Sequence, residues 1–151
     1  MLIEITKLLD VSEKGTTIQF QTELGIGQGL WRNYNPQPQP GQAYHVEMDI
    51  LDESAIGQNF MVVEVDNKTN DAYRLEWQNG EMIIQGEIDT VWDDRVVAMT
   101  VKAQRSSVSF LLNVPELAPY KDRFVRIHTK RISLSDCNIP PEMSVINSWS
   151  S

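Results

Sequence analysis

The chain has 151 residues, of which 41% are hydrophobic, and its formal net charge is −8. This length suits one domain, or two very small ones that share a core, and the apolar fraction excludes a disordered chain. No apolar run approaches the roughly 20 residues of a membrane-spanning helix, and the single cysteine, Cys137, excludes an internal disulfide. The first ten residues, MLIEITKLLD, are interpreted as part of the fold and not as a signal peptide. We therefore expect a globular cytoplasmic protein that does not associate with membranes.

The charges are distributed unevenly along the chain. Residues 1–94 hold 17 acidic and 5 basic residues, whereas residues 95–151 hold 4 acidic and 8 basic ones. Two segments of opposite charge on different faces would create a strong field across the molecule. The alternative is that the surface charge serves solubility alone.

Alternation of apolar and polar residues dominates the chain and is typical of half-buried strands. In the run 43–50, for example, Tyr44, Val46, Met48 and Ile50 would share one face. Asn79-Gly80 predicts a type I′ hairpin turn, since both central residues of that turn need a positive φ. The remaining strands are predicted at 17–23, 60–66, 72–78, 95–103, 107–113 and 124–134, and one short helical turn at 52–58, with Asp52 as its N-cap.

This spacing of about ten residues predicts an all-β fold, an antiparallel small barrel or sandwich. At an offset of 79 positions the two halves repeat one pattern: Trp31 falls on Phe110, Pro36 on Pro115 and Pro40 on Pro119. We interpret residues 1–137 as a single β domain with two OB- or SH3-like half-repeats that share a core. The half-repeats span 1–66 and 72–134, with a seam near 66–71, and residues 138–151 form a tail that is flexible or docked.

Two proline-bearing segments stand at corresponding positions of the halves. They are NPQPQPG at 35–41 and VPELAPY at 114–120. Because proline cannot donate to a strand ladder, both are predicted to be surface loops near polyproline conformation, and 35–41 is not a domain linker.

The sequence offers little for catalysis. The two histidines, His45 and His128, fall on polar strand faces, and no cluster of His or Cys has the spacing of a metal site. The segment GIGQG at 25–29 has neither the following helix nor the Lys-Ser/Thr of a phosphate-binding loop, so we expect a hairpin loop or bulge. Cys137 lacks the context of an activated nucleophile. We therefore predict a protein that is not an enzyme and has no cofactor or metal.

An acidic surface is the first candidate for a binding site. A compact acidic β protein without catalytic residues is typical of an inhibitor or immunity-type protein that binds and neutralises a basic partner, such as a bacterial toxin. The residues predicted to form this surface are Glu47, Asp49, Asp52, Glu53, Asp93 and Asp94, with Trp31, Tyr34 or Trp92 as aromatic anchors.

A basic strand is the alternative. With Val125 and Ile127 pointing inward, the outer face of 124–134 would present cations, as OB-folds do when they hold single-stranded nucleic acid. The residues in question are Arg123, Arg126, His128 and Lys130, with Lys102, Arg105 and Arg131 nearby. The low isoelectric point, about 4.7, opposes this interpretation because it repels phosphates at long range. The oligomeric state is left open.

Overall fold

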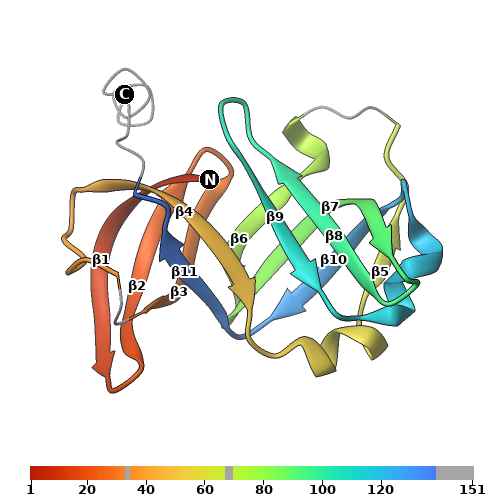
Figure 1. Cartoon of the computed structure of the whole chain (residues 1–151). Helices are drawn as coiled ribbons and strands as arrows, with labels where there is room; N and C mark the ends of the chain where they lie inside the picture. Colours follow the sequence, from red (N-terminus) through yellow and green to blue (C-terminus); the bar gives the residue numbers. More distant parts are fainter. Residues whose placement is uncertain (33–34, 67–69, 139–151) are drawn as a thin grey trace.

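The computed structural model describes residues 1–32, 35–66 and 70–138, and these residues form an all-β fold (Figure 1). The first strands are β1 (Leu2–Ser12), β2 (Gly15–Thr22), β3 (Gly25–Arg32), β4 (Ala43–Ile50) and β5 (Met61–Val63). The later ones are β6 (Arg74–Gln78), β7 (Glu81–Trp92), β8 (Val96–Lys102), β9 (Ser107–Leu112), β10 (Phe124–Thr129) and β11 (Ile132–Asp136). Three 3₁₀ helices lie between them: η1 (Glu53–Gln58), η2 (Asn70–Ala72) and η3 (Pro115–Tyr120).

Five strands close into a small barrel. Their order around the barrel is β1-β2-β3-β11-β4, and β4 returns to pair with β1. All neighbours are antiparallel except β3 and β11, which run parallel. If β11 is counted as the fifth strand, this is the strand order of the OB-fold, a five-stranded Greek-key barrel.

The second sheet repeats this order without closing. Strands β7, β8, β9 and β10 occur 79 residues after β1, β2, β3 and β4 or within a few positions of that offset. As β1 pairs with β4 and then β2, the long strand β7 pairs with β10 along its first half and with β8 along its second, and β6 pairs with the first half of β7 in addition. The registers differ, however: Ile3 pairs with Tyr44, whereas Met82 pairs with Thr129 and not with Arg123, which the offset would give.

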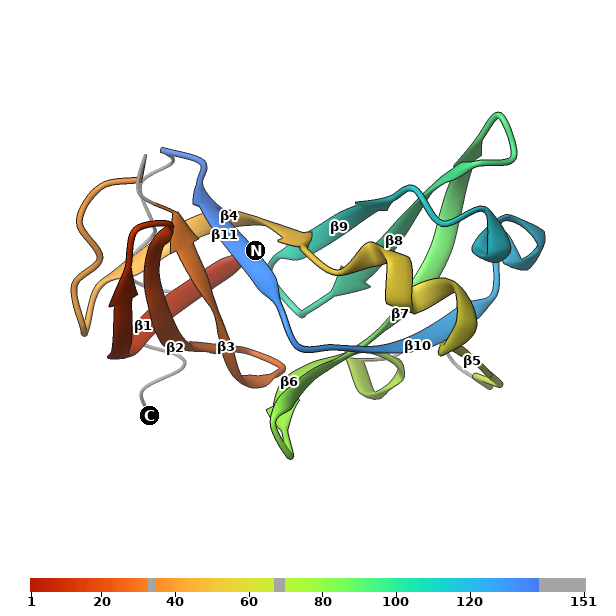
Figure 2. The same ribbon diagram turned by 90° about the horizontal axis from the view of Figure 1, so that it is seen from below.

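The two sheets exchange their fifth strands. The chain leaves β4 of the barrel through η1 and contributes β5 to the second sheet, where β5 pairs with β10. It then leaves β10 and returns to contribute β11 to the barrel, between β3 and β4. In Figure 2 these two crossings connect the barrel, on the left, to the second sheet, on the right. Each sheet therefore needs a strand from the other half of the sequence, so a division near 66–71, of which 67–69 lie outside the described residues, does not separate two sheets.

One hydrophobic core runs through both sheets. Barrel residues such as Ile3, Phe20 and Trp31 belong to the same buried cluster as Ile84 and Phe110 of the second sheet. Two glycines make close packing possible: a Cβ on Gly27 would overlap the Phe20 ring, and one on Gly29 would lie 2.5 Å from Leu134 Cδ1. The segment 25–29 is therefore the start of β3 and not a hairpin loop or bulge, because the absence of side chains leaves room for its neighbours.

Four further details differ from the sequence predictions. The run 60–66 forms a strand only over Met61–Val63, and the run 124–134 is two strands separated at Lys130 and Arg131. The segment 114–120 is not an extended loop, since η3 forms there and buries Leu117. Asp52 stands at the N-cap of η1 but makes no side-chain capping bond.

The hairpin prediction at Asn79-Gly80 is confirmed, since the two residues have φ of 53° and 84° and connect β6 to β7. The pair Asp93-Asp94 forms a second turn of this kind, with φ of 52° and 55°, between β7 and β8. Within the described ranges, no helix has the length and apolar character to cross a membrane.

Candidate functional site

A groove of about 300 Å³ lies on the outside of the barrel, beside the junction with the second sheet. It is bordered by the turn between β1 and β2, by the outer face of β2 and β3, and by the two crossings that carry the exchanged strands. OB-folds bind their ligands on this part of the barrel, across strands 2 and 3 and the loops 1–2 and 4–5. The lining residues are Ser12, Lys14, Thr17, Gln28, Gly29, Leu30, Leu51, Trp77, Lys130, Arg131 and Ile132.

The strand exchange itself builds one wall of this groove. In a simple OB barrel a single loop joins strands 4 and 5, whereas here the whole second sheet stands between β4 and β11. The two crossings are bound to each other, because the Leu51 main-chain N–H donates to the Arg131 carbonyl over 2.9 Å. Lys130 and Arg131 therefore reach the groove from the point where β10 ends and β11 begins.

Three cations line this groove. Lys14 belongs to the β1–β2 turn, and Lys130 and Arg131 belong to the crossing between β10 and β11. All three side chains are exposed. Within residues 1–32, 35–66 and 70–138, none of their charged groups forms a hydrogen bond or an ion pair. The groove thus offers positive charge that the described part of the protein leaves uncompensated.

The floor of the groove carries polar side chains of two adjacent strands. Thr17 of β2 and Gln28 of β3 are half-buried on the outer face of the barrel. The indole of Trp77, on β6, is also half-buried and adds an aromatic surface to the wall. Cations and aromatic rings are the groups with which OB-folds hold single-stranded nucleic acid.

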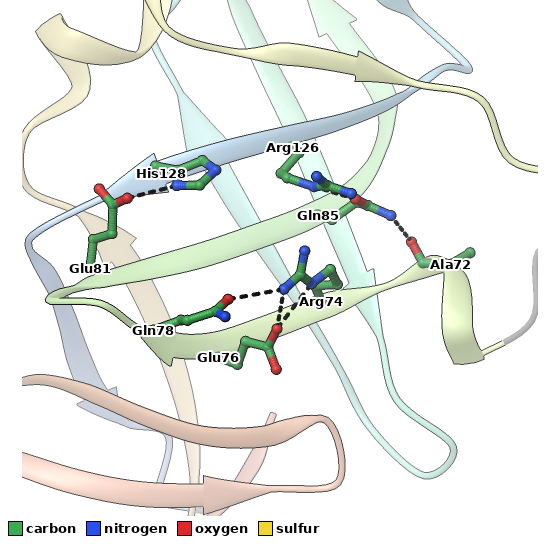
Figure 3. A network of polar contacts seen from close by, with 8 residues as sticks. All are labelled: Ala72, Arg74, Glu76, Gln78, Glu81, Gln85, Arg126 and His128. Atoms are coloured by element: carbon green, nitrogen blue, oxygen red, sulfur yellow. Dashed lines mark hydrogen bonds and ion pairs between the residues drawn. The ribbon is translucent and has the colours of Figure 1, made fainter.

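The predicted basic strand has a different environment. Val125 and Ile127 do point inward and are fully buried. On the outer face, however, three of the four residues named for nucleic acid already have partners, as Figure 3 shows for Arg126 and His128. Arg126 Nε donates to Gln85 Oε1 over 2.8 Å, His128 Nδ1 lies 2.8 Å from Glu81 Oε1, and Arg123 is paired with Glu64. Only Lys130 of the four lines the groove.

The outer face of β6, β7 and β10 is instead a network of polar contacts (Figure 3). The Gln85 side chain is almost fully buried, and it both accepts from Arg126 and donates to the Ala72 carbonyl over 2.8 Å. Arg74 pairs with Glu76 and also donates to Gln78. The charged groups of Arg74, Arg126 and His128 on this face are thus paired within the protein.

The six acidic residues predicted to form one surface lie on separate elements of the fold. Glu47 and Asp49 are exposed on β4, where they line a second groove, of about 360 Å³, together with Ser107, Ser109 and Leu111 of β9. Asp52 and Glu53 follow at the start of η1. Asp93 and Asp94 instead occupy the tip of the β7–β8 hairpin in the second sheet.

The three aromatic residues predicted as anchors also differ in their location. Trp31 is wrong as an anchor, because it is 1% exposed inside the barrel and its indole N–H donates to the Pro36 carbonyl over 2.7 Å. Trp92 is 47% exposed beside the Asp93-Asp94 turn. Tyr34 lies outside the described residues.

The remaining titratable candidates show no catalytic arrangement. Burial raises the pKa of the Cys137 thiol, and the nearby Glu47 carboxylate raises it further, which is opposite to the shift of an activated nucleophile. His45 lies on β4 and is half-buried. No group of three or more His, Cys, Asp or Glu side chains among the described residues is arranged to hold a metal ion.

Three residues of the groove were not singled out from the sequence: Lys14, Gln28 and Trp77. A lysine in a predicted turn and a glutamine on a strand are ordinary surface residues until the partner strands are known. Trp77 follows the apolar alternation of β6, so its pattern indicates core packing. The pairing of the strands is the observation that brings these residues together in one groove.

Comparison with known proteins adds no relative: no family model, no curated protein and no solved structure matches this chain.

Proposed function

We propose that the groove beside the β1–β2 turn binds single-stranded nucleic acid. The observation that carries this proposal is a set of three cations, Lys14, Lys130 and Arg131, that line a groove on the β2–β3 side of an OB-type barrel and whose charged groups have no partner among the described residues. Cations that line one groove can contact successive phosphates of one strand. The Trp77 indole, which lines the same groove, supplies a stacking surface that accepts any base.

The acidic character of the whole chain is compatible with this proposal. At 0.1 M salt the Debye length is about 10 Å, so acids on distant elements act weakly on a ligand in the groove. Three of the acids on elements that border the groove take part in contacts of their own: Glu76 pairs with Arg74, Asp52 accepts a hydrogen bond from Thr129, and Glu13 also has a partner. Asp10, the exposed cross-strand partner of Thr17, offsets part of the positive charge that a phosphate meets there.

The expected affinity is modest and weakly salt-dependent. Three cations neutralise at most three phosphates, and each phosphate contributes a slope of about −0.7 to the dependence of log K on log salt for single strands. The slope for this protein should therefore be about −2. Proteins that bind along a whole basic surface show much steeper slopes.

The proposal is tested by fluorescence anisotropy with labelled single-stranded DNA and RNA decamers at several salt concentrations. Lys14→Ala and Lys130→Ala should each weaken binding several-fold and flatten the salt slope by roughly 0.7. Lys102→Ala is the matched control, because Lys102 is an exposed lysine at the end of β8 and does not line the groove. Equal losses in all three variants would contradict the groove as the binding site.

The same experiment separates this proposal from an acidic inhibitor. If the decamers do not bind at all, single-stranded nucleic acid is excluded as the ligand. Tight binding of a basic protein that is abolished by Glu47→Gln and Asp49→Asn, but not by Lys14→Ala, would then support the inhibitor.

A further inference from the structure

We propose that Gln28 recognises the edge of a nucleobase, so that the groove binds the base as well as the phosphates. This inference rests on the proposed function and adds that the protein contacts the nucleobase. Two glutamines that lie directly opposite each other on the barrel differ in their hydrogen bonds.

Gln19 of β2 and Gln28 of β3 are cross-strand partners on the outer face. Both are half-buried. The Gln19 amide already has a partner, because its Nε2 donates to Thr6 Oγ1 over 3.2 Å. In the described part of the chain, the Gln28 amide has no such contact, although its main-chain N–H lies 3.5 Å from Met82 Sδ.

The position of Gln28 in the groove matches its free hydrogen-bonding capacity. It lies on the outer face of β3 and lines the groove together with Lys14, Lys130 and Arg131. A strand whose phosphates contact these cations places a base over the floor, where the amide offers one donor group and one acceptor. Every nucleobase edge presents a donor or an acceptor to such a group. The amide should therefore favour a strand that carries bases over an abasic strand.

The surroundings strengthen this contact. Leu30 and Trp77 line the same groove, and they reduce the access of water to a base that stacks there. A hydrogen bond that a half-buried amide makes to a ligand replaces a contact with water, and its net value corresponds to roughly a two- to tenfold change in affinity. A loss of this size can be measured, and the phosphate contacts should still hold the strand in the groove.

The test compares two single-stranded probes of equal charge. One is a thymidine decamer, and the other is a decamer of abasic deoxyribose phosphates. Wild-type protein should bind the thymidine decamer more tightly. Gln28→Met keeps the length of the side chain and removes its hydrogen bonds, so it should weaken binding of the thymidine decamer roughly two- to tenfold and leave the abasic decamer unchanged.

Gln19→Met is the control, because it makes the same change on the same face at a residue that does not line the groove. It should leave both affinities unchanged, and the unfolding midpoints of both variants should confirm that they are folded. If Gln28→Met binds both probes as wild type does, or if wild type does not distinguish them, base recognition is overturned while phosphate binding stands. If neither probe binds the wild type, the proposed function fails as well.

Discussion

The Thr129 hydroxyl donates a hydrogen bond to the Asp52 carboxylate, and this contact joins the two points at which the chain crosses between the barrel and the second sheet. Thr129 ends β10, whereas Asp52 follows β4. Two residues after Thr129 and one residue before Asp52, the Arg131 carbonyl accepts a hydrogen bond from the Leu51 N–H. These two hydrogen bonds therefore connect the segment that follows β4 to the segment that follows β10, which are the two segments that lead to the exchanged strands.

The first prediction concerns the hydrogen bond between Thr129 and Asp52. Thr129→Val should lower the free energy of unfolding by about 1.5–3 kcal/mol, because it removes a hydrogen bond to a carboxylate from a residue that is 2% exposed. Thr90→Val is the control, since Thr90 donates to Asp89 in an exposed Thr–carboxylate pair and should change the stability little. Urea denaturation of both variants measures the difference. Equal stabilities would show that the crossing contact is not significant.

The second prediction concerns the seat of β11 in the barrel. A Cβ on Gly29 would lie 2.5 Å from Leu134 Cδ1 and 2.9 Å from Ile132 Cγ1, both on β11. Gly29→Ala should therefore destabilise the protein by about 1–3 kcal/mol through overpacking. It should also weaken ligand binding, because Gly29 lines the groove.

Gly57→Ala is the matched control for this overpacking. There the added Cβ meets only the carboxylate end of Glu116, an exposed side chain that can rotate away. The stability of this variant, measured by thermal unfolding, should stay close to that of wild type. A loss of stability as large as that of Gly29→Ala would mean that close packing of β11 against Gly29 is not the cause of the destabilisation.

The sequence predicts those strands that show a clear alternation of their own, whereas the strands Leu2–Ser12 and Gly25–Arg32 are not predicted. The buried residues Val46, Met48 and Ile50 and the turn at Asn79-Gly80 follow from local rules of side-chain period and backbone φ. The partners of a strand do not follow from such rules. Nothing within residues 132–136 indicates that they pair with β3 and β4, so the exchange, and with it the groove, is visible only in three dimensions.

One break in the pattern does carry a signal. After the buried Phe124 at the start of β10, the buried residues are the odd-numbered Val125, Ile127 and Thr129, whereas the buried apolar residues of β11 are the even-numbered Ile132 and Leu134. A strand cannot change the parity of its buried face without an interruption. This change of phase marks Lys130 and Arg131 as a crossing, although the apolar content of 124–134 favours one strand. In β3 the buried positions before Trp31 are glycines. Because glycine has no apolar side chain, the sequence shows no alternation there that would predict the burial of Trp31.

The third prediction concerns the β7–β8 turn. Asp93 and Asp94 both have a positive φ, and the Arg95 N–H donates to the Trp92 carbonyl over 3.0 Å. Glycine adopts this conformation without the steric cost of a Cβ, so Asp94→Gly should stabilise the protein by about 0.5–1 kcal/mol. The reverse change in the other hairpin, Gly80→Ala, should destabilise it, since Gly80 has a φ of 84°. Thermal unfolding midpoints should move in opposite directions, and a shift of both in one direction would contradict the argument.

The last prediction concerns the thiol of Cys137. Burial is the main reason that its pKa is raised, and the Glu47 carboxylate adds to the effect because a neighbouring negative charge disfavours the thiolate. Since only the thiolate reacts with iodoacetamide, alkylation of the folded protein at neutral pH should be slower than that of a free cysteine, and it should accelerate as the pH rises through the raised pKa.

Glu47→Gln removes the nearby charge and should move the midpoint of this pH profile to lower pH. Asp93→Asn is the control, because Asp93 lies at the tip of the β7–β8 hairpin and does not influence the Cys137 pKa. A profile that both substitutions shift equally would indicate a general effect of net charge. Since the Glu47 carboxylate also lines the groove between β4 and β9, a shift confined to Glu47→Gln would confirm that this groove brings the thiol and the carboxylate together in solution.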